Sequence, residues 1–184
     1  MRIHLLPLML LAAACLAGCD GDGHGHHETI ANYISIHDGS IAVHAPGRAD
    51  ADISAVGDLS IADASVPVSA AQRDLLKHYY GTALTLRDHG IATGKAGVAT
   101  AGQALKSVVS GLASGNPDRI DGEVNASAAR VEAQAALVCN DLADLYTAQQ
   151  ALATQLAAFQ PYARIKASEA DDCRRGLQKD HGGH

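Results

Sequence analysis

The sequence has very few aromatic residues and few basic ones. Its 184 residues include no tryptophan and one phenylalanine, and aromatic residues make up 3% of the chain. Any core must therefore be mainly aliphatic, and few rings are present on which a ligand could stack. Lys and Arg number 14 against 20 Asp and Glu, the formal net charge is -6, and Arg174-Arg175 is the only adjacent basic pair. This distribution excludes the basic surface that nucleic-acid binding needs.

Long apolar runs are also lacking, apart from one near the start of the chain. The run Leu5–Leu16 is too short for a bilayer-crossing helix, which needs about 20 apolar residues, but it fits the core of a secretory signal. It leads into Leu16-Ala17-Gly18-Cys19, which resembles the lipobox of bacterial lipoproteins. We therefore predict that residues 1–18 are a signal peptide and that Cys19 carries covalent lipid. The alternative is that Cys19 is one half of a disulfide.

The predicted anchor places the protein in the cell envelope, facing the periplasm, with the membrane as its first partner. Each buried methylene of an acyl chain contributes about 0.8 kcal/mol, so several chains on Cys19 would hold the protein firmly. Asp20 follows directly, and in the lipoprotein systems that this lipobox resembles, such an aspartate favours retention at the inner membrane. That rule differs between bacteria, so the choice between inner and outer membrane stays open.

Cysteines are scarce as well. Of the four, Cys15 leaves with the signal and Cys19 carries lipid, so Cys139 and Cys173 remain in an oxidising compartment. We predict a disulfide between them. Two free thiols or a metal-binding pair are the alternatives, although no other cysteine or histidine stands at ligand spacing from either residue.

Histidines are concentrated near the two ends of the mature chain. Residues 19–29 are polar and rich in glycine, and we predict that they form a flexible tether. Flexible histidine tracts also bind divalent transition metals such as zinc, copper or nickel, and no other cofactor is expected. The candidate metal ligands are His24, His26 and His27, with His181 and His184 repeating the pattern at the other end.

Residues 30–68 have the pattern of a small antiparallel sheet. Apolar residues alternate on both sides of Asp38-Gly39, the strongest short signal for a hairpin turn. Gly57-Asp58 predicts a second, weaker hairpin, and Val66–Val68 a further strand. The two-residue turn at Asp38-Gly39 predicts cross-strand pairs that all lie on one face, namely Ile36 with Ile41 and Ile34 with Val43.

Residues 69–115 are predicted to form a helix that begins with a capping box at Ser69 and Gln72. Its first apolar stripe is Leu76, Tyr79, Ala83 and Leu86. Small residues then continue at the same spacing of three and four: Gly90, Gly94, Gly97, Ala101, Ala104, Val108, Gly111 and Gly115. Each interior glycine costs about 1 kcal/mol relative to alanine, so we expect this glycine seam to pack closely against a second helix. A break in the helix near residues 88–90 is the alternative.

Residues 121–160 are predicted to form a second long helix, packed antiparallel on the glycine seam. Its apolar positions alternate by four and three, as in a coiled coil: Val131, Ala135, Val138, Leu142, Leu145, Gln149, Leu152, Leu156 and Phe159. Gln149 is the one polar member, and we expect it to fix the register. A disulfide to Cys173 requires the chain after Pro161 to return at about 2.5 Å per residue, which is longer than the α-helical rise. The tail, residues 161–184, is therefore expected to be partly extended.

Four segments carry a family resemblance: Asp38-Gly39-Ser40, Gly57-Asp58-Leu59-Ser60-Ile61, the run from Val68 to Tyr80, and Gly94-Lys95-Ala96-Gly97. They resemble a YggN-like family of bacterial periplasmic proteins and lipoproteins of unknown function. The resemblance implies strands followed by helices and brings no catalytic residues. The lipobox departs from members that carry only a cleavable signal, so a freely soluble periplasmic location does not follow.

Together these features predict an α+β fold, with a small N-terminal antiparallel β-hairpin sheet followed by long antiparallel Ala/Gly-rich helices. No catalytic constellation is found. His78 and His89 have no serine, cysteine or carboxylate that spacing alone would place beside them, and we expect both to face solvent. We expect an anchored structural or interaction module with a protein partner in the envelope, and the alternative is a metal-binding envelope protein.

Overall fold

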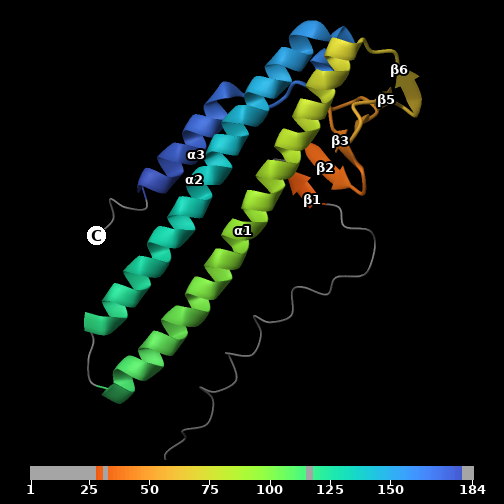
Figure 1. The fold of residues 1–184 in the computed structure, drawn as a ribbon. Helices are drawn as coiled ribbons and strands as arrows, with labels where there is room; N and C mark the ends of the chain where they lie inside the picture. Colours follow the sequence, from red (N-terminus) through yellow and green to blue (C-terminus); the bar gives the residue numbers. More distant parts are fainter. Residues whose placement is uncertain (1–27, 31–32, 115–117, 180–184) are drawn as a thin grey trace, which may run out of the picture.

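The computed structural model describes residues 28–30, 33–114 and 118–179, and it has the predicted α+β fold (Figure 1). A small antiparallel sheet comes first and long antiparallel helices follow. The strands are β1 (Glu28–Ile30), β2 (Ile34–His37), β3 (Ser40–Val43), β4 (Ala51–Ser54), β5 (Leu59–Ile61) and β6 (Ala64–Val66). The helices are α1 (Ala70–Ser114), α2 (Asp118–Gln155), the 3-10 helix η1 (Ala157–Tyr162) and α3 (Ala167–Lys179).

The six strands form a meander in which each strand pairs with its neighbours in sequence. The predicted register of the first hairpin is confirmed, because β2 and β3 pair Ile36 with Ile41 and Ile34 with Val43. Gly39 in its turn has a φ of +81°, which glycine adopts without a steric cost. The second predicted hairpin is formed by β4 and β5.

Both ends of the sheet differ from the prediction. β1 begins at Glu28 and pairs with β2, so the strand structure starts inside the segment 19–29 that was predicted as a tether. The last strand begins at Ala64 because the chain already turns after β5, and it ends at Val66, before Pro67, so it does not reach Val68. Both residues of that turn, Ala62 and Asp63, have positive φ (52° and 61°), the conformation of the tight turns that match the twist of a hairpin.

The sheet is attached to the first turn of α1. The predicted capping box is present: the Ser69 N–H donates to Gln72 Oε1 at 2.8 Å, and the Gln72 N–H donates to Ser69 Oγ at 3.3 Å. The turn between β4 and β5 packs here as well, because a Cβ on Gly57 would lie 2.4 Å from the carbonyl oxygen of Arg73. Arg73 also forms an ion pair with Asp58. Glycine at position 57 therefore allows the sheet to approach the helix this closely.

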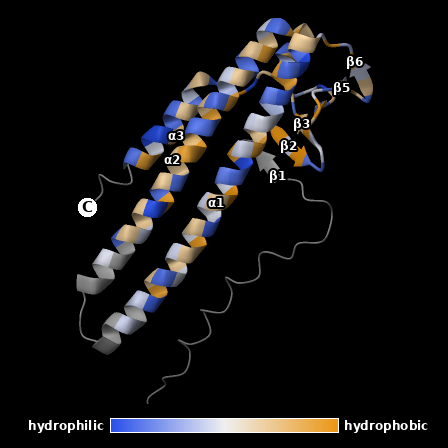
Figure 2. Cartoon of the chain, in the orientation of Figure 1, coloured by the Kyte–Doolittle hydropathy of each residue, from blue (hydrophilic) through white to orange (hydrophobic). Residues whose placement is uncertain are grey.

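One hydrophobic core joins the inner face of the sheet to the helices. The predicted stripe of α1 is buried in full, namely Leu76, Tyr79, Ala83 and Leu86. Tyr79 contacts Phe159 edge to face, with the ring centroids 5.4 Å apart, so two of the few aromatic rings meet inside this core. Figure 2 shows the apolar residues concentrated where the sheet meets the helices.

The second long helix differs from the prediction at both ends. It begins at Asp118 and ends at Gln155, whereas the predicted range was 121–160. Gln149 is fully buried and binds both backbone groups of Ile165: the Ile165 N–H donates to Oε1 at 3.0 Å, and Nε2 donates to the Ile165 carbonyl at 2.9 Å. The one polar residue of the predicted coiled-coil stripe thus holds the returning chain against α2.

The tail folds back along α2 and is joined to it by the predicted disulfide. Cys139 and Cys173 are bonded, with their Cα atoms 5.5 Å apart. The prediction that the tail is not one continuous helix is confirmed, because residues 163–166 separate η1 from α3. Most of the tail is nevertheless helical, since α3 spans Ala167–Lys179.

Beyond the core, α1 and α2 continue side by side as a two-helix projection (Figure 1). α1 is helical without interruption over 45 residues, so the break considered near residues 88–90 is absent. At 1.5 Å per residue this helix is about 68 Å long. We call residues 89–114 and 118–138 the arm, and the rest of the described chain the head.

Candidate functional site

Three side chains on the outer face of the sheet form a Ser-His-Asp hydrogen-bond chain. His44 Nε2 lies 2.7 Å from Ser35 Oγ, and His44 Nδ1 lies 2.8 Å from Asp50 Oδ1. The strand register explains this arrangement, because Ser35, Ala42 and Asp52 lie side by side on one face of the sheet. His44 directly follows β3, Asp50 directly precedes β4, and each is two residues from Ala42 or Asp52, so both project from the same side. The connectivity is that of a serine-hydrolase triad. Sequence reasoning missed it, although the register of the first hairpin already places Ser35 near His44.

This hydrogen-bond chain lacks the surroundings that acyl-transfer chemistry needs. β2 lies between β1 and β3, so its backbone N–H groups point along the sheet and not into a pocket that could hold an oxyanion. The hollow on this face is lined by aspartates and serines of β3 to β6, and Ser35 is not part of its lining. We therefore interpret the three residues as a clasp that links β2, β3 and β4.

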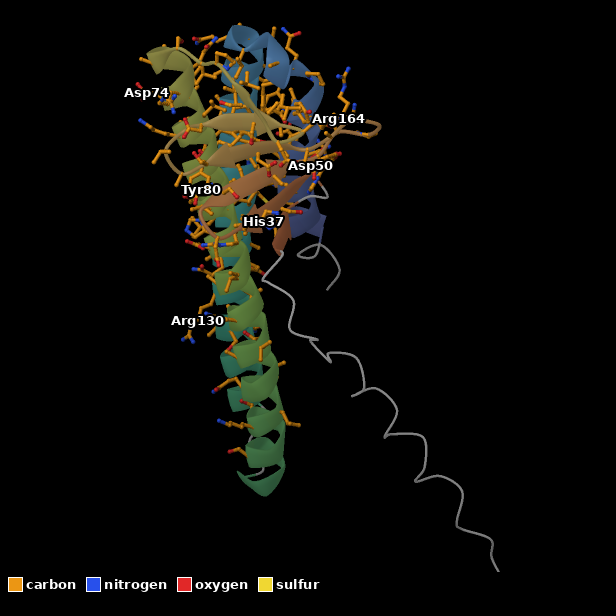
Figure 3. All side chains as sticks on the ribbon, turned by 90° about the vertical axis from the view of Figure 1, so that its right-hand side faces the viewer. His37, Asp50, Asp74, Tyr80, Arg130 and Arg164 are labelled. Atoms are coloured by element: carbon orange, nitrogen blue, oxygen red, sulfur yellow. A yellow bond between two sulfur atoms is a disulfide. The ribbon has the colours of Figure 1, made fainter. Side chains whose placement is uncertain are left out.

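The same face collects acidic residues. Partial burial raises the pKa of Asp52, and the neighbouring Asp50 carboxylate raises it further, while His37 acts in the opposite direction. His37 and Asp50 are labelled in Figure 3 on the side of the sheet that faces the viewer. Despite these acidic and histidine side chains, no group of three His, Cys, Asp or Glu in the described part of the chain has an arrangement that could hold a metal ion.

The predicted metal ligands lie outside the described residues, both His24, His26 and His27 at one end and His181 and His184 at the other. The lipidation site Cys19 lies outside them too. Within the described residues, no helix is long and apolar enough to cross a membrane.

The two helix histidines behave differently from each other. His78 is exposed, as expected, and lines a groove between α1 and α2 with Lys77 and Asp144. The expectation for His89 was wrong, because its Nδ1 lies 2.5 Å from Oδ2 of Asp141, a residue that is 8% exposed. The two residues are 52 positions apart, so only the packing of the two helices reveals this pair. The pair sits where the arm meets the head and links α1 to α2.

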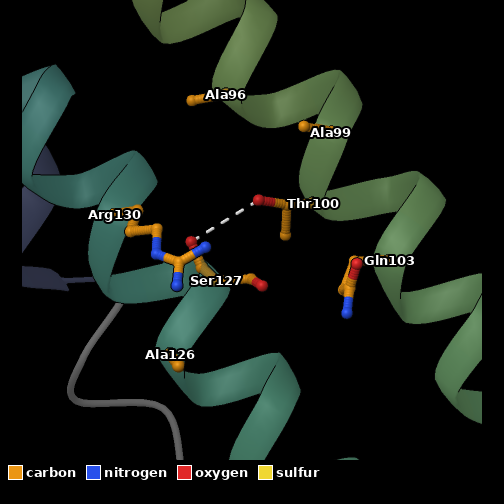
Figure 4. A pocket seen from close by; sticks show the side chains of 7 residues that line it. All are labelled: Ala96, Ala99, Thr100, Gln103, Ala126, Ser127 and Arg130. Carbon is orange, nitrogen blue, oxygen red and sulfur yellow. Dashed lines mark hydrogen bonds between the residues drawn. The ribbon is translucent and has the colours of Figure 1, made fainter.

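The seam between the two helices of the arm is lined by small and polar side chains. On α1, the positions turned towards α2 are Thr93, Ala96, Thr100, Ala104 and Ser107. Thr100 donates from Oγ1 to the backbone carbonyl of Ser127 at 3.5 Å (Figure 4). A cavity of about 270 Å³ opens beside this contact, between alanines and the side chains of Gln103 and Arg130. On the α1 side, the seam therefore buries little apolar surface.

Within residues 89–107, the large aliphatic side chains of α1 point away from α2. Ile91, Val98 and Leu105 stand seven residues apart on one side of the helix, and they are 38%, 76% and 68% exposed. The small residues between them, Gly94, Ala101 and Gly102, are exposed as well. We call these six residues the outer stripe. Over residues 89–107, α1 thus turns small and polar residues towards α2 and its large apolar residues outwards, the reverse of a self-contained helical hairpin.

The prediction that the glycine seam packs closely against α2 is therefore wrong. Gly90, Gly94 and Ala101 face solvent, and only Gly97 and Ala104 are half-buried. A Cβ added at Gly90, Gly94 or Gly97 would meet no atom within 4 Å, so close packing inside the chain does not explain these glycines. The remaining members of the seam, at 108, 111 and 115, lie among residues whose side chains are not described.

Comparison with known proteins gives no match. No family model, no curated protein and no solved structure matches the chain. The resemblance to the YggN-like family stays a prediction that rests on its four short segments. Any function has to be argued from the chain itself.

Proposed function

We propose that this protein is a lipid-anchored interaction module of the cell envelope, which binds a protein partner through the outer stripe of its arm. Two features support the location. The Leu16–Cys19 motif has the sequence of a lipobox, and the disulfide between Cys139 and Cys173 suits an oxidising compartment.

The observation that carries the proposal is the reversed packing of the arm. Val98 and Leu105 are the most exposed large apolar residues of the described chain, and with Ile91 they form one continuous side of a long helix. Full burial of a valine or leucine side chain contributes about 1.5 to 3 kcal/mol, and most of the surface of Val98 and Leu105 is still exposed. A partner that covers the outer stripe would gain this free energy without any rearrangement of the head.

The rest of the described surface offers less to a protein partner. The outer face of the sheet carries serines, aspartates and histidines, and the groove beside His78 is lined by threonines and charged residues. In the head, Val56 is the one large apolar side chain counted as exposed, and it stands alone in the turn between β4 and β5. A single exposed valine is ordinary for a folded protein, whereas an apolar side chain repeated on one helix face marks an interaction site.

Photocrosslinking in intact cells tests the proposal. A benzophenone amino acid at position 98 should crosslink to protein, and the same probe at position 56 is the matched control, because Val56 is 61% exposed and lies in the head. We expect protein adducts from position 98 and none from position 56. Equal labelling at both positions, or adducts to lipid alone, would contradict the proposal.

A further inference from the structure

We propose that the partner of the outer stripe is a second copy of this chain, packed antiparallel so that the two α1 helices meet across a two-fold axis. This inference rests on the proposed function and names the occupant of the same surface. The inference is based on the pattern of side-chain size in the outer stripe, which is complementary to itself in an antiparallel pair. Binding to an unrelated partner would not require this self-complementarity.

The side chains of the outer stripe alternate in size. Ile91, Val98 and Leu105 are large, while Gly94 and Ala101 between them are small. A two-fold axis midway between residues 99 and 100 sets Val98 opposite Ala101 of the second copy and, at the same time, Leu105 opposite Gly94 of the second copy. Val98 and Leu105 then each meet a nearly bare stretch of backbone, as close helix packing requires.

The antiparallel arrangement explains the exposed glycine at position 94. A Cβ on Gly94 would meet no atom of its own chain within 4 Å, so the chain itself does not require glycine there. Glycine inside a helix costs about 1 kcal/mol relative to alanine. A side chain at position 94 would occupy the space that Leu105 of the second copy needs, and this explains why the bare position lies on the outward side.

The area fits a weak, reversible dimer. Residues 89–114 of α1 extend over about 39 Å, and covering a third of the circumference of a helix about 10 to 12 Å wide buries about 400 to 500 Å² on each copy. The total of about 900 Å² lies just below the size of a stable specific interface and is typical of a transient contact. This size fits a contact between chains that are already folded and disulfide-bonded.

A membrane surface fits the outer stripe less well. Helices that lie in a lipid interface carry bulky Trp, Phe or Leu on the apolar side and several Lys or Arg on the polar side. The outer stripe has three aliphatic side chains among glycines and an alanine, and Lys95 and Lys106 are the only basic residues of residues 89–114. Small residues favour close helix contact, while they add little to lipid insertion.

Spin-label distances in the full mature chain, purified in detergent micelles, test both the contact and its direction. Single cysteines for labelling are introduced at Asp88, Ala99 and Lys106, which are exposed. Asp88 and Lys106 lie beside the outer stripe, and Ala99 lies between the outer stripe and the cavity next to α2. The antiparallel arrangement predicts backbone separations between equivalent residues of about 10 Å at 99, about 22 Å at 106 and about 36 Å at 88, from the helical rise and a helix spacing of about 10 Å. Equal short distances at all three positions would show parallel packing and overturn the arrangement.

Two matched substitutions separate the contact from folding. Gly94→Leu should abolish the intermolecular distances, while Gly81→Leu, at an equally open glycine of the same helix, should leave them unchanged. Circular dichroism should show both variants folded. Unchanged distances in Gly94→Leu would overturn the proposal, as would the absence of intermolecular distances in the unsubstituted chain. If the unsubstituted chain shows no intermolecular distances and position 98 crosslinks to a different protein, the dimer proposal is wrong and the proposed function stands. If position 98 crosslinks to lipid alone, both the dimer proposal and the proposed function are wrong.

Discussion

Removal of the disulfide tests how the tail is held on α2. The double substitution Cys139→Ser and Cys173→Ser deletes the bond and leaves no free thiol at either position. The bond joins residues 34 positions apart, and chain entropy predicts a stabilisation of about 3.8 kcal/mol for a loop of this size. In a domain of this length each kcal/mol corresponds to roughly 2 to 4 °C in Tm, so thermal denaturation should show a loss of about 8 to 15 °C.

Loss of the disulfide should destabilise α3 more than the rest of the protein. Apart from the bond, α3 is held by buried Ala170 and by exposed contacts such as that of Arg174 with Asn140. The Gln149 amide that binds Ile165 lies upstream and does not depend on the bond. Hydrogen exchange should therefore become faster in α3, while the backbone around Ile165 stays protected.

The control is the unsubstituted protein treated with a reductant, which should reproduce both the lower Tm and the faster exchange of α3. A double variant with the same Tm as the parent and full protection in α3 would refute the reasoning. Peptide mass spectrometry of the non-reduced protein checks the premise, because the peptides that contain Cys139 and Cys173 should be found linked.

Four further predictions concern single features. Gln149→Leu should lower the free energy of unfolding by about 2 to 4 kcal/mol in urea titrations, because two buried backbone groups lose their partner; an unchanged value would show that the amide is dispensable. Tyr79→Phe should leave this free energy unchanged or raise it by about 1 kcal/mol, since the buried Tyr79 hydroxyl has no hydrogen-bond partner; a clear loss would reveal one. Cys19→Ser should leave the precursor uncut and abolish membrane retention of a mature form, and normal processing with unchanged fractionation would contradict lipidation. Replacement of the histidines of residues 24–27 by serine should change neither fold nor stability, and tight stoichiometric zinc binding that calorimetry finds lost in this variant would favour the metal-binding alternative.

The local features of the fold could be predicted because each depends on a few adjacent residues. The turn at Asp38-Gly39 determines the register of β2 and β3, and the capping box at Ser69 determines where α1 begins. The outermost strand β1 was missed because only three residues form it and a polar segment precedes it. The 3-10 segment after α2 was missed because the apolar spacing of three and four continues from Leu156 to Phe159 across the end of the helix.

The face of α1 that packs against α2 in the arm could not be predicted from the glycine spacing. Small residues occur on every side of α1 between residues 89 and 107, so a line of small residues can be drawn along more than one face. The more informative signal was the seven-residue spacing of Ile91, Val98 and Leu105, whose side chains are large enough for their direction to matter. Pairs such as His89 with Asp141 remain out of reach of sequence reasoning, because they depend on the axial alignment of two long helices.

The meander topology also determines the order in which the protein can assemble. Each strand pairs with a neighbour only a few residues away, so these hairpins can form within microseconds as soon as their residues are available. The core that buries the apolar side of the sheet also contains Leu145, Leu152 and Phe159, which come late in the chain. The sheet can therefore form first, but its apolar face stays partly exposed until these C-terminal residues pack in the core. The first hairpins form at the N-terminal end of the chain, but the core is completed only when the C-terminal residues pack.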